Sequence, residues 1–102
     1  MSQRITSLAP RRSVAFPYTI RRRTSASWRV VSDIPVHVFL LGDEGLAQFN
    51  RGDPTIETVG GGGPKRRVHE EESELPSGGV WYLLVFNPSD TDAAHIFHEL
   101  SA

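Results

Sequence analysis

The sequence predicts an all-β fold, a single antiparallel β-sandwich of the jelly-roll type with about seven or eight short strands. Two apolar runs, 36–41 and 80–87, are rich in β-branched and aromatic residues and are typical of the central strands of a sheet. Shorter segments that alternate between apolar and polar residues surround these runs, and turn-forming residues separate them. The chain has 102 residues, which is enough for one domain with a modest core.

The N-terminal part divides into a tail and an edge strand. Residues 1–12 lack periodicity and predict a loosely docked tail, so we place the β-sandwich domain at 13–102. Segment 13–20 alternates with the period of two that marks a half-buried strand. Pro17 cannot donate a hydrogen bond to a ladder and therefore places this strand at a sheet edge.

Two further strands and a hairpin are expected in the centre of the chain. Segment 27–32 alternates, and Asp33-Ile34-Pro35 predicts a break or bend between it and the buried strand 36–41. Gly42-Asp43-Glu44-Gly45 combines two glycines with two acids, which is typical of a turn. We therefore expect a hairpin that leads into a weaker strand at 46–50.

The stretch 51–79 is poor in apolar residues and predicts a long flexible loop. The four glycines at 60–63 indicate a flexible connection, and 68–74 is an edge strand at best. After the strand 80–87, segment 91–100 suits either a short helix or a strand, and we favour the strand.

The alternation also predicts which side chains form the core, because successive residues of a strand point to opposite faces of the sheet. The expected core consists of Phe16, Trp28, Val30, Val36, Val38, Leu40, Leu83, Val85 and Ile96.

Charge is strongly segregated along the chain. Residues 1–30 contain seven arginines and no acid, so with a net charge of −1 the remainder carries −8. Such asymmetry indicates either an anionic partner or a basic segment that packs against the protein's own acidic segments. The candidate binding residues come from the arginine-rich N-terminal part and from the basic block in the 51–79 loop: Arg21, Arg22, Arg23, Arg29, Lys65, Arg66 and Arg67.

Catalytic and metal-binding patterns are weak. The chain has no cysteine, and no Ser, His and acid set carries a recognisable nucleophile turn. His95 and His98 are three residues apart, so they share a face only if they lie on a helix. We therefore expect a non-enzymatic protein with no cofactor and no metal.

A carbohydrate-binding role would need the ring of Trp81 or Tyr82 to face solvent. The alternative is that these rings pack in the core.

No segment of the sequence has the length and apolarity of a membrane span or the apolar centre of a signal peptide, which leads us to expect a soluble cytoplasmic protein.

Two segments carry a resemblance to a known family. Residues 27–38, Ser-Trp-Arg-Val-Val-Ser-Asp-Ile-Pro-Val-His-Val, and residues 75–88, which include Pro76, Gly79, Trp81 and Asn87, resemble the GOLD-type β-sandwich. Bacterial pre-peptidase-type sandwiches share much of this pattern. The resemblance implies an antiparallel sandwich that binds proteins, lipids or membranes and does not catalyse a reaction. Unlike the secretory cargo receptors of that family, this sequence shows no signal peptide, membrane span or disulfide pair, so a role in vesicle traffic is not implied.

The first functional hypothesis is therefore a protein-interaction module, an accessory or scaffold subunit that uses its sheet edges and the 51–79 loop. The alternatives are a binder of nucleic acid or acidic lipid through the N-terminal arginines, and a small carbohydrate-binding module.

The strand 13–20, which Arg21–Arg23 follow, and the acidic segment 70–74 both look like sheet edges, and their charges are opposite. If these two edges pair between two subunits, the protein is a salt-sensitive homodimer. If they pair within one subunit, it is a monomer in which the two segments are neighbours. We favour self-association.

Overall fold

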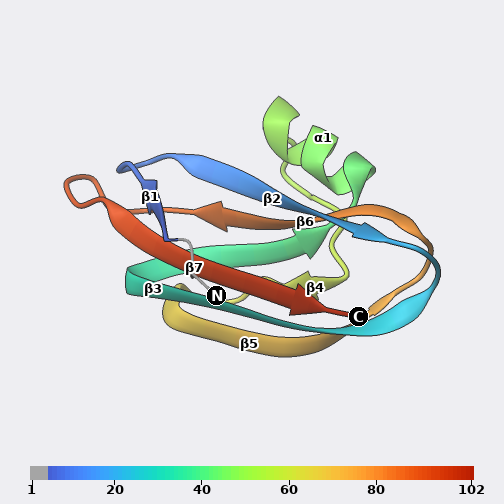
Figure 1. The fold of residues 1–102 in the computed structure, drawn as a ribbon. Coiled ribbons are helices and arrows are strands. Elements are labelled where there is room, and N and C mark those ends of the chain that lie inside the picture. The colour runs from blue at the N-terminus through green and yellow to red at the C-terminus, as the bar shows by residue number, and fades with distance from the viewer. Residues whose placement is uncertain (1–4) are drawn as a thin grey trace.

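The computed structural model describes residues 5–102, which form seven strands and one helix (Figure 1). The elements are β1 (Thr6–Leu8), β2 (Ser13–Ile20), β3 (Thr24–Leu41), α1 (Asp43–Arg51), β4 (Gly60–Gly61), β5 (Arg66–Leu75), β6 (Gly79–Phe86) and β7 (Ala94–Ser101). Every strand pair is antiparallel, and the strands join into one sheet of order β1-β7-β3-β6-β2, with β4 and β5 also paired to β3. The predicted all-β antiparallel fold is confirmed.

The long strand β3 turns this single sheet into two facing halves. Its first part pairs with β5 and β7, and its last part, from His37 onward, pairs with β6 and β4. The ladder with β5 shifts register between Val31 and Val36, where Pro35 cannot donate a hydrogen bond. The predicted bend therefore occurs within one continuous strand, which carries the sheet around a corner.

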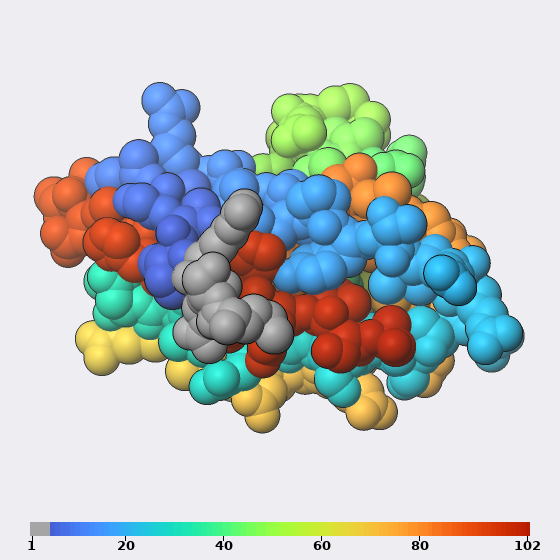
Figure 2. Space-filling model, in the orientation of Figure 1, coloured from blue at the N-terminus to red at the C-terminus, as the bar shows by residue number. Residues whose placement is uncertain are grey.

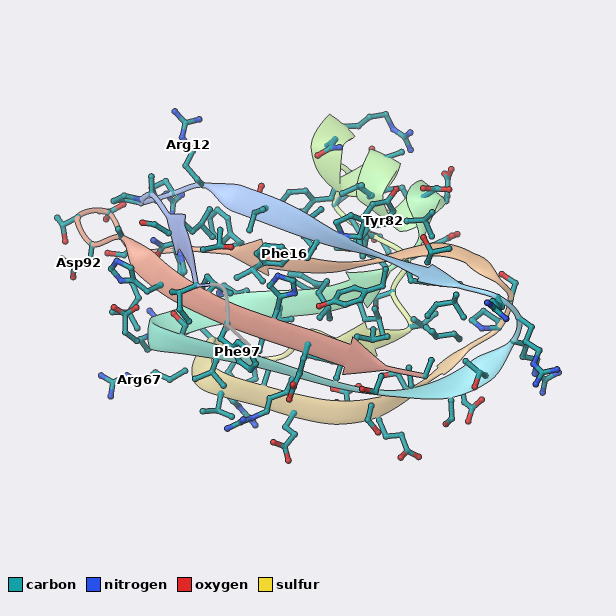
Figure 3. The ribbon with its side chains drawn as sticks, in the orientation of Figure 1. Arg12, Phe16, Arg67, Tyr82, Asp92 and Phe97 are labelled. Atoms are coloured by element: carbon teal, nitrogen blue, oxygen red, sulfur yellow. The ribbon has the colours of Figure 1, made fainter. Side chains whose placement is uncertain are left out.

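The core lies between the two halves. Of the side chains expected there, all but Phe16 are buried, and Phe16 packs against the core while remaining half-exposed. Within the described part of the chain β2 pairs only with β6, so no strand closes the sheet between β2 and β7. The ring of Phe16 instead spans this opening and stacks on His98 at 3.7 Å between ring centroids (Figure 3).

The hairpin expected at Gly42–Gly45 is wrong, because Asp43–Arg51 forms α1. Two acids occupy the first turn of this helix, where they interact favourably with its dipole, and Gly52 ends it with a φ of 74°. Gly45 is a packing glycine, since a Cβ atom there would collide with the backbone oxygen of Glu57. Figure 2 shows α1 standing out from the sheet above β2 and β6.

Helix α1 explains why the run 80–87 is apolar on both faces. Trp81, Leu83 and Val85 face the core, whereas Leu84 points the other way and is nevertheless buried. Leu41 of β3, on the same outer face, is also fully buried. A strand covered on both sides reads as a continuous apolar run.

The prediction of one long flexible loop over 51–79 is wrong, because β4 and the ten-residue strand β5 lie inside that range. The edge strand expected within it at 68–74 is confirmed as part of β5, which pairs only with β3 over the described residues. The glycines at 60–63 are not a free connection. Gly60 and Gly61 pair with Leu40 and Phe39, and a Cβ atom on Gly60 would collide with the hydroxyl of Ser73. These glycines allow close approach of the backbone to β3 and β5.

The prediction of a loosely docked N-terminal tail at 1–12 is wrong for part of that range. Thr6–Leu8 forms β1 and pairs with Ala94–Ile96 of β7, while residues 1–4 lie outside the described residues. The segment 91–100, which suited a helix or a strand, contains the strand β7, as favoured.

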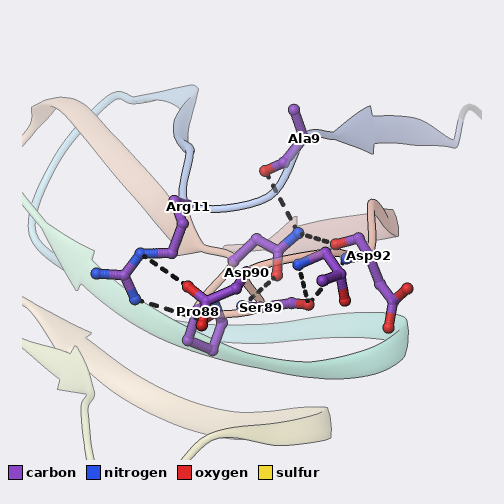
Figure 4. Close-up of polar contacts among 8 residues, drawn as sticks. Ala9, Arg11, Pro88, Ser89, Asp90 and Asp92 are labelled. Atoms are coloured by element: carbon purple, nitrogen blue, oxygen red, sulfur yellow. Dashed lines mark hydrogen bonds and ion pairs between the residues drawn. The ribbon is translucent and has the colours of Figure 1, made fainter.

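Asn87 holds the ends of four strands together, and Figure 4 shows Ala9, Ser89 and Asp92, whose backbone groups it contacts. Its fully buried side-chain amide donates to the backbone oxygens of Leu8, Ala9 and Asp92, and its oxygen accepts from the backbone of Ser89. The β1–β2 turn and the β6–β7 loop are thereby held against each other.

Candidate functional site

The basic candidate residues do not form one patch. Arg21, Arg22 and Arg23 occupy the turn between β2 and β3, whereas Lys65–Arg67 lie where β5 begins. Along β5, Arg66 is opposite Val36 and Leu75 is opposite Thr24. Since a strand of this length spans roughly 30 Å, the two basic clusters lie at opposite ends of β5. Figure 3 shows Arg67 extending away from the sheet at the start of the strand.

The remaining candidate, Arg29, lies between these clusters and already forms an ion pair within the protein. It stands opposite Glu70 of β5 and Glu99 of β7 in the two ladders, and its Nε is 3.3 Å from the Glu70 carboxylate. Arg29 therefore belongs to an acidic surface and not to a basic one.

That surface is the outer face of β5, β3 and β7, which we call the acidic sheet face. It is defined by the side chains that point away from the core in these three strands: Val68, Glu70, Glu72, Glu74, Ser25, Ser27, Arg29, Val31, Phe97, Glu99 and Ser101. It carries four carboxylates against one guanidinium. Because opposite residues in antiparallel ladders have neighbouring Cβ atoms, these side chains form transverse rows.

One of these rows is apolar. Val31 stands opposite Val68 on one side and Phe97 on the other. Val68 is 47% exposed, and the other two side chains are half-buried. The row lies directly beside the row of Glu70, Arg29 and Glu99, so one end of the face is apolar and the rest is charged or polar.

A shallow depression of about 460 Å³ lies over the charged part of this face. The side chains that line it come from all three strands and include Ser27, Arg29, Glu72, Glu99 and Ser101. A peptide-sized segment could therefore lie across β3 with carboxylates on both sides.

Strand β5 is held firmly enough to present these side chains. The indole nitrogen of buried Trp28 donates to the hydroxyl of Ser73 at 3.0 Å, and Nε2 of buried His69 is 2.8 Å from the backbone oxygen of Val36. Glu71 in turn accepts from the backbone of Gly61. Polar side chains on the inner face of β5 thus replace part of the apolar core.

The histidines near the C-terminus face opposite sides of β7. Exposed His95 contacts Asp33, whose carboxylate accepts both its backbone N–H and its Nδ1–H at 2.8 Å. The backbone N–H of His95, and then its ring, hold the pKa of Asp33 below its usual value. Over residues 5–102 no three His, Asp or Glu side chains are grouped as a metal site requires.

His98 points inward, where it stacks on Phe16 and its Nδ1 forms a hydrogen bond with the hydroxyl of Tyr18. Burial lowers the pKa of His98, and burial together with Glu99 raises the pKa of Tyr18 to about 12. Both side chains are therefore neutral near pH 7, so the pair offers neither a charged ligand nor an activated nucleophile.

The two aromatic rings considered for carbohydrate binding are largely buried or hydrogen-bonded within the protein. Trp81 is only 9% exposed, and its indole donates to the backbone oxygen of Ser77. Tyr82 is half-buried beside α1, and its hydroxyl donates to Asp43, which raises the pKa of Tyr82. One partly exposed ring does not make an aromatic platform.

Sequence reasoning missed the acidic sheet face because it treated 51–79 as a loop with at best an edge strand at 68–74, and did not place that strand beside β3 and β7. The available signal was the alternation of His69, Ser73 and Leu75 with glutamates, which has the period of a strand but places two polar residues inward.

The chain matches no protein-family model, and no curated protein matches it. The fold alone gives its class: an all-β protein, with seven antiparallel strands in residues 5–102. In the part of the chain that the structure describes, no helix is long and apolar enough to cross a membrane.

Proposed function

We propose that this protein is a non-enzymatic interaction module, an accessory or scaffold subunit, that binds a basic and partly apolar protein segment on the acidic sheet face. The observation that carries the proposal is the apolar row of Val31, Val68 and Phe97 beside the charged row of Glu70, Arg29 and Glu99. Exposed apolar groups rimmed by charge are typical of protein-binding surfaces.

The energies favour a partner that uses both rows. An exposed ion pair contributes only about 0.2–1 kcal/mol, so the carboxylates alone give specificity and faster association more than affinity. Burying the exposed part of the apolar row supplies the attraction that salt does not screen. We therefore expect a partner segment in which apolar residues lie next to lysines or arginines. The resemblance to GOLD-type sandwiches supports the same class of function.

The alternative, an anionic-surface binder, is less well supported. Arg21–Arg23 and Lys65–Arg67 lie at opposite ends of β5 with the glutamates of the acidic sheet face between them. A nucleic acid or an acidic membrane that contacted both clusters would also meet those carboxylates.

The direct experiment is affinity capture from the source cells followed by quantitative mass spectrometry. Deleting 51–79 would remove β5, so point substitutions are needed. The variant Phe97→Ser with Glu99→Gln changes one side chain in each row, and Asp90→Asn with Glu44→Gln is a control away from the face. We expect the face variant to lose the main partners and the control to keep them. Equal capture by both variants would refute the proposal.

A further inference from the structure

The outer edge of β5 is basic at the start of the strand and acidic further along it. The strand begins with Arg66 and Arg67 and continues through Glu70, Glu71 and Glu72. Over residues 5–102, β5 pairs only with β3, so the backbone groups on its other side are free to pair. Charged side chains commonly protect such edges, and this edge carries both signs at separate ends.

We propose that the edge of β5 binds the β5 edge of a second copy of this chain, antiparallel and across a two-fold axis. An antiparallel arrangement brings the basic start of one strand to the acidic end of the other. A parallel arrangement would place like charges side by side. The charge order therefore makes the edge complementary to itself in only one direction.

The side chains also select a register. With the two-fold axis at His69, Arg66 is opposite Glu72 of the second copy, and Arg67 is opposite Glu71. A shift of one residue per strand, with the axis at Glu70, would bring two Glu70 side chains together and keep only the pair of Arg66 with Glu74. A shift the other way, with the axis at Val68, would pair Arg66 with Glu70, which already contacts Arg29, and would leave Arg67 opposite His69. The first register forms oppositely charged pairs at both ends and is the one that we assign.

Pairing β5 with the edge strand β2 of another copy is less favourable. The segment Ser13–Ile20 carries no charge, and Pro17 lacks an N–H group. Such a head-to-tail contact would also leave a free edge on each copy and continue as a chain, whereas the two-fold contact closes at a dimer. The inference concerns the edge of β5, so it stands independently of the partner proposed for its face.

The test uses a reciprocal charge exchange at two exposed positions, Arg66 and Glu72. Sedimentation equilibrium is measured for the full chain and for Arg66→Glu, Glu72→Arg, and the variant with both changes. Glu74→Arg is the matched control, because it changes the same charge outside the assigned pairs. Circular dichroism and the unfolding midpoint verify that each variant is folded.

We expect the unchanged chain to dimerise, and each single variant to dimerise at least about tenfold more weakly, since two attractive contacts become repulsive. The two single variants, mixed, should form a heterodimer, and the double variant should dimerise like the unchanged chain. A monomer under all conditions overturns the proposal. A dimer that is as stable in both single variants as in the unchanged chain also overturns the proposal. Weakening by Glu74→Arg but not by Glu72→Arg refutes the assigned register.

Discussion

The indole nitrogen of Trp28 on β3 lies 3.0 Å from the hydroxyl of Ser73 on β5. Both side chains are buried, and this hydrogen bond crosses from the largest core residue to the strand that carries the acidic sheet face. A strand whose inner side is partly polar is thereby fixed to the core.

Replacing Ser73 with Ala should lower the free energy of unfolding by about 1–3 kcal/mol, because the buried indole N–H of Trp28 loses its acceptor. Urea denaturation measures the change. Ser25→Ala, which removes a hydroxyl that donates to Glu74 at the exposed end of the same ladder, should cost about 0.5 kcal/mol or less. Equal costs for the two variants would contradict the role of the Trp28 contact.

Asn87→Ala should be among the most destabilising polar substitutions. It leaves the backbone oxygens of Leu8, Ala9 and Asp92 without the amide that binds them, at a cost of about 1–3 kcal/mol or more. Hydrogen exchange of β1 should also accelerate, since that strand loses its tie to the β6–β7 loop. A loss of stability with unchanged protection of β1 would argue against the proposed tie.

The unfolding free energy should fall as the pH drops below about 6.5, the usual pKa of histidine. Burial lowers the pKa of His98, so the unfolded chain binds that proton more readily than the folded one, and acid favours unfolding. His98→Gln should reduce the slope between pH 7 and the lower folded pKa, whereas His95→Gln should keep it. A slope that is unchanged in His98→Gln would show that another group is responsible.

A second acid step should come from Asp33. Its pKa is lowered, so its contribution to stability is present above its unfolded pKa, near 3.8, and is lost as the pH falls through the folded value. Asp33→Asn should make the loss of stability below pH 4 shallower, and Asp92→Asn, on the exposed β6–β7 loop, should not. Acid denaturation followed by circular dichroism compares the two.

The strands that form the core could be predicted because their side chains alternate without interruption. Trp28, Val30, Val36, Val38 and Leu40 all point inward along one strand, and the bend at Pro35 does not change which face they share. The helix α1 could not be predicted in this way, because Gly45 looks like a turn residue. Its small size is in fact needed for packing against Glu57.

Strand β5 was predicted only as a weak edge strand inside a loop, for a different reason. Hydrophobic periodicity detects apolar side chains that face a core, but His69 and Ser73 satisfy their buried position through hydrogen bonds to Val36 and Trp28. Those partners lie more than thirty residues away in sequence, so the pattern that makes β5 a strand exists only in the folded sheet. The acidic sheet face could not be predicted without it.

The most direct test of this account is residue-resolved amide hydrogen exchange of Arg66–Leu75 at increasing protein concentration. The account predicts that the amides bonded to β3 are protected at every concentration, and that the amides on the free edge become protected only as the concentration rises. Rapid exchange along the whole segment at every concentration would contradict the strand and its role as a binding edge.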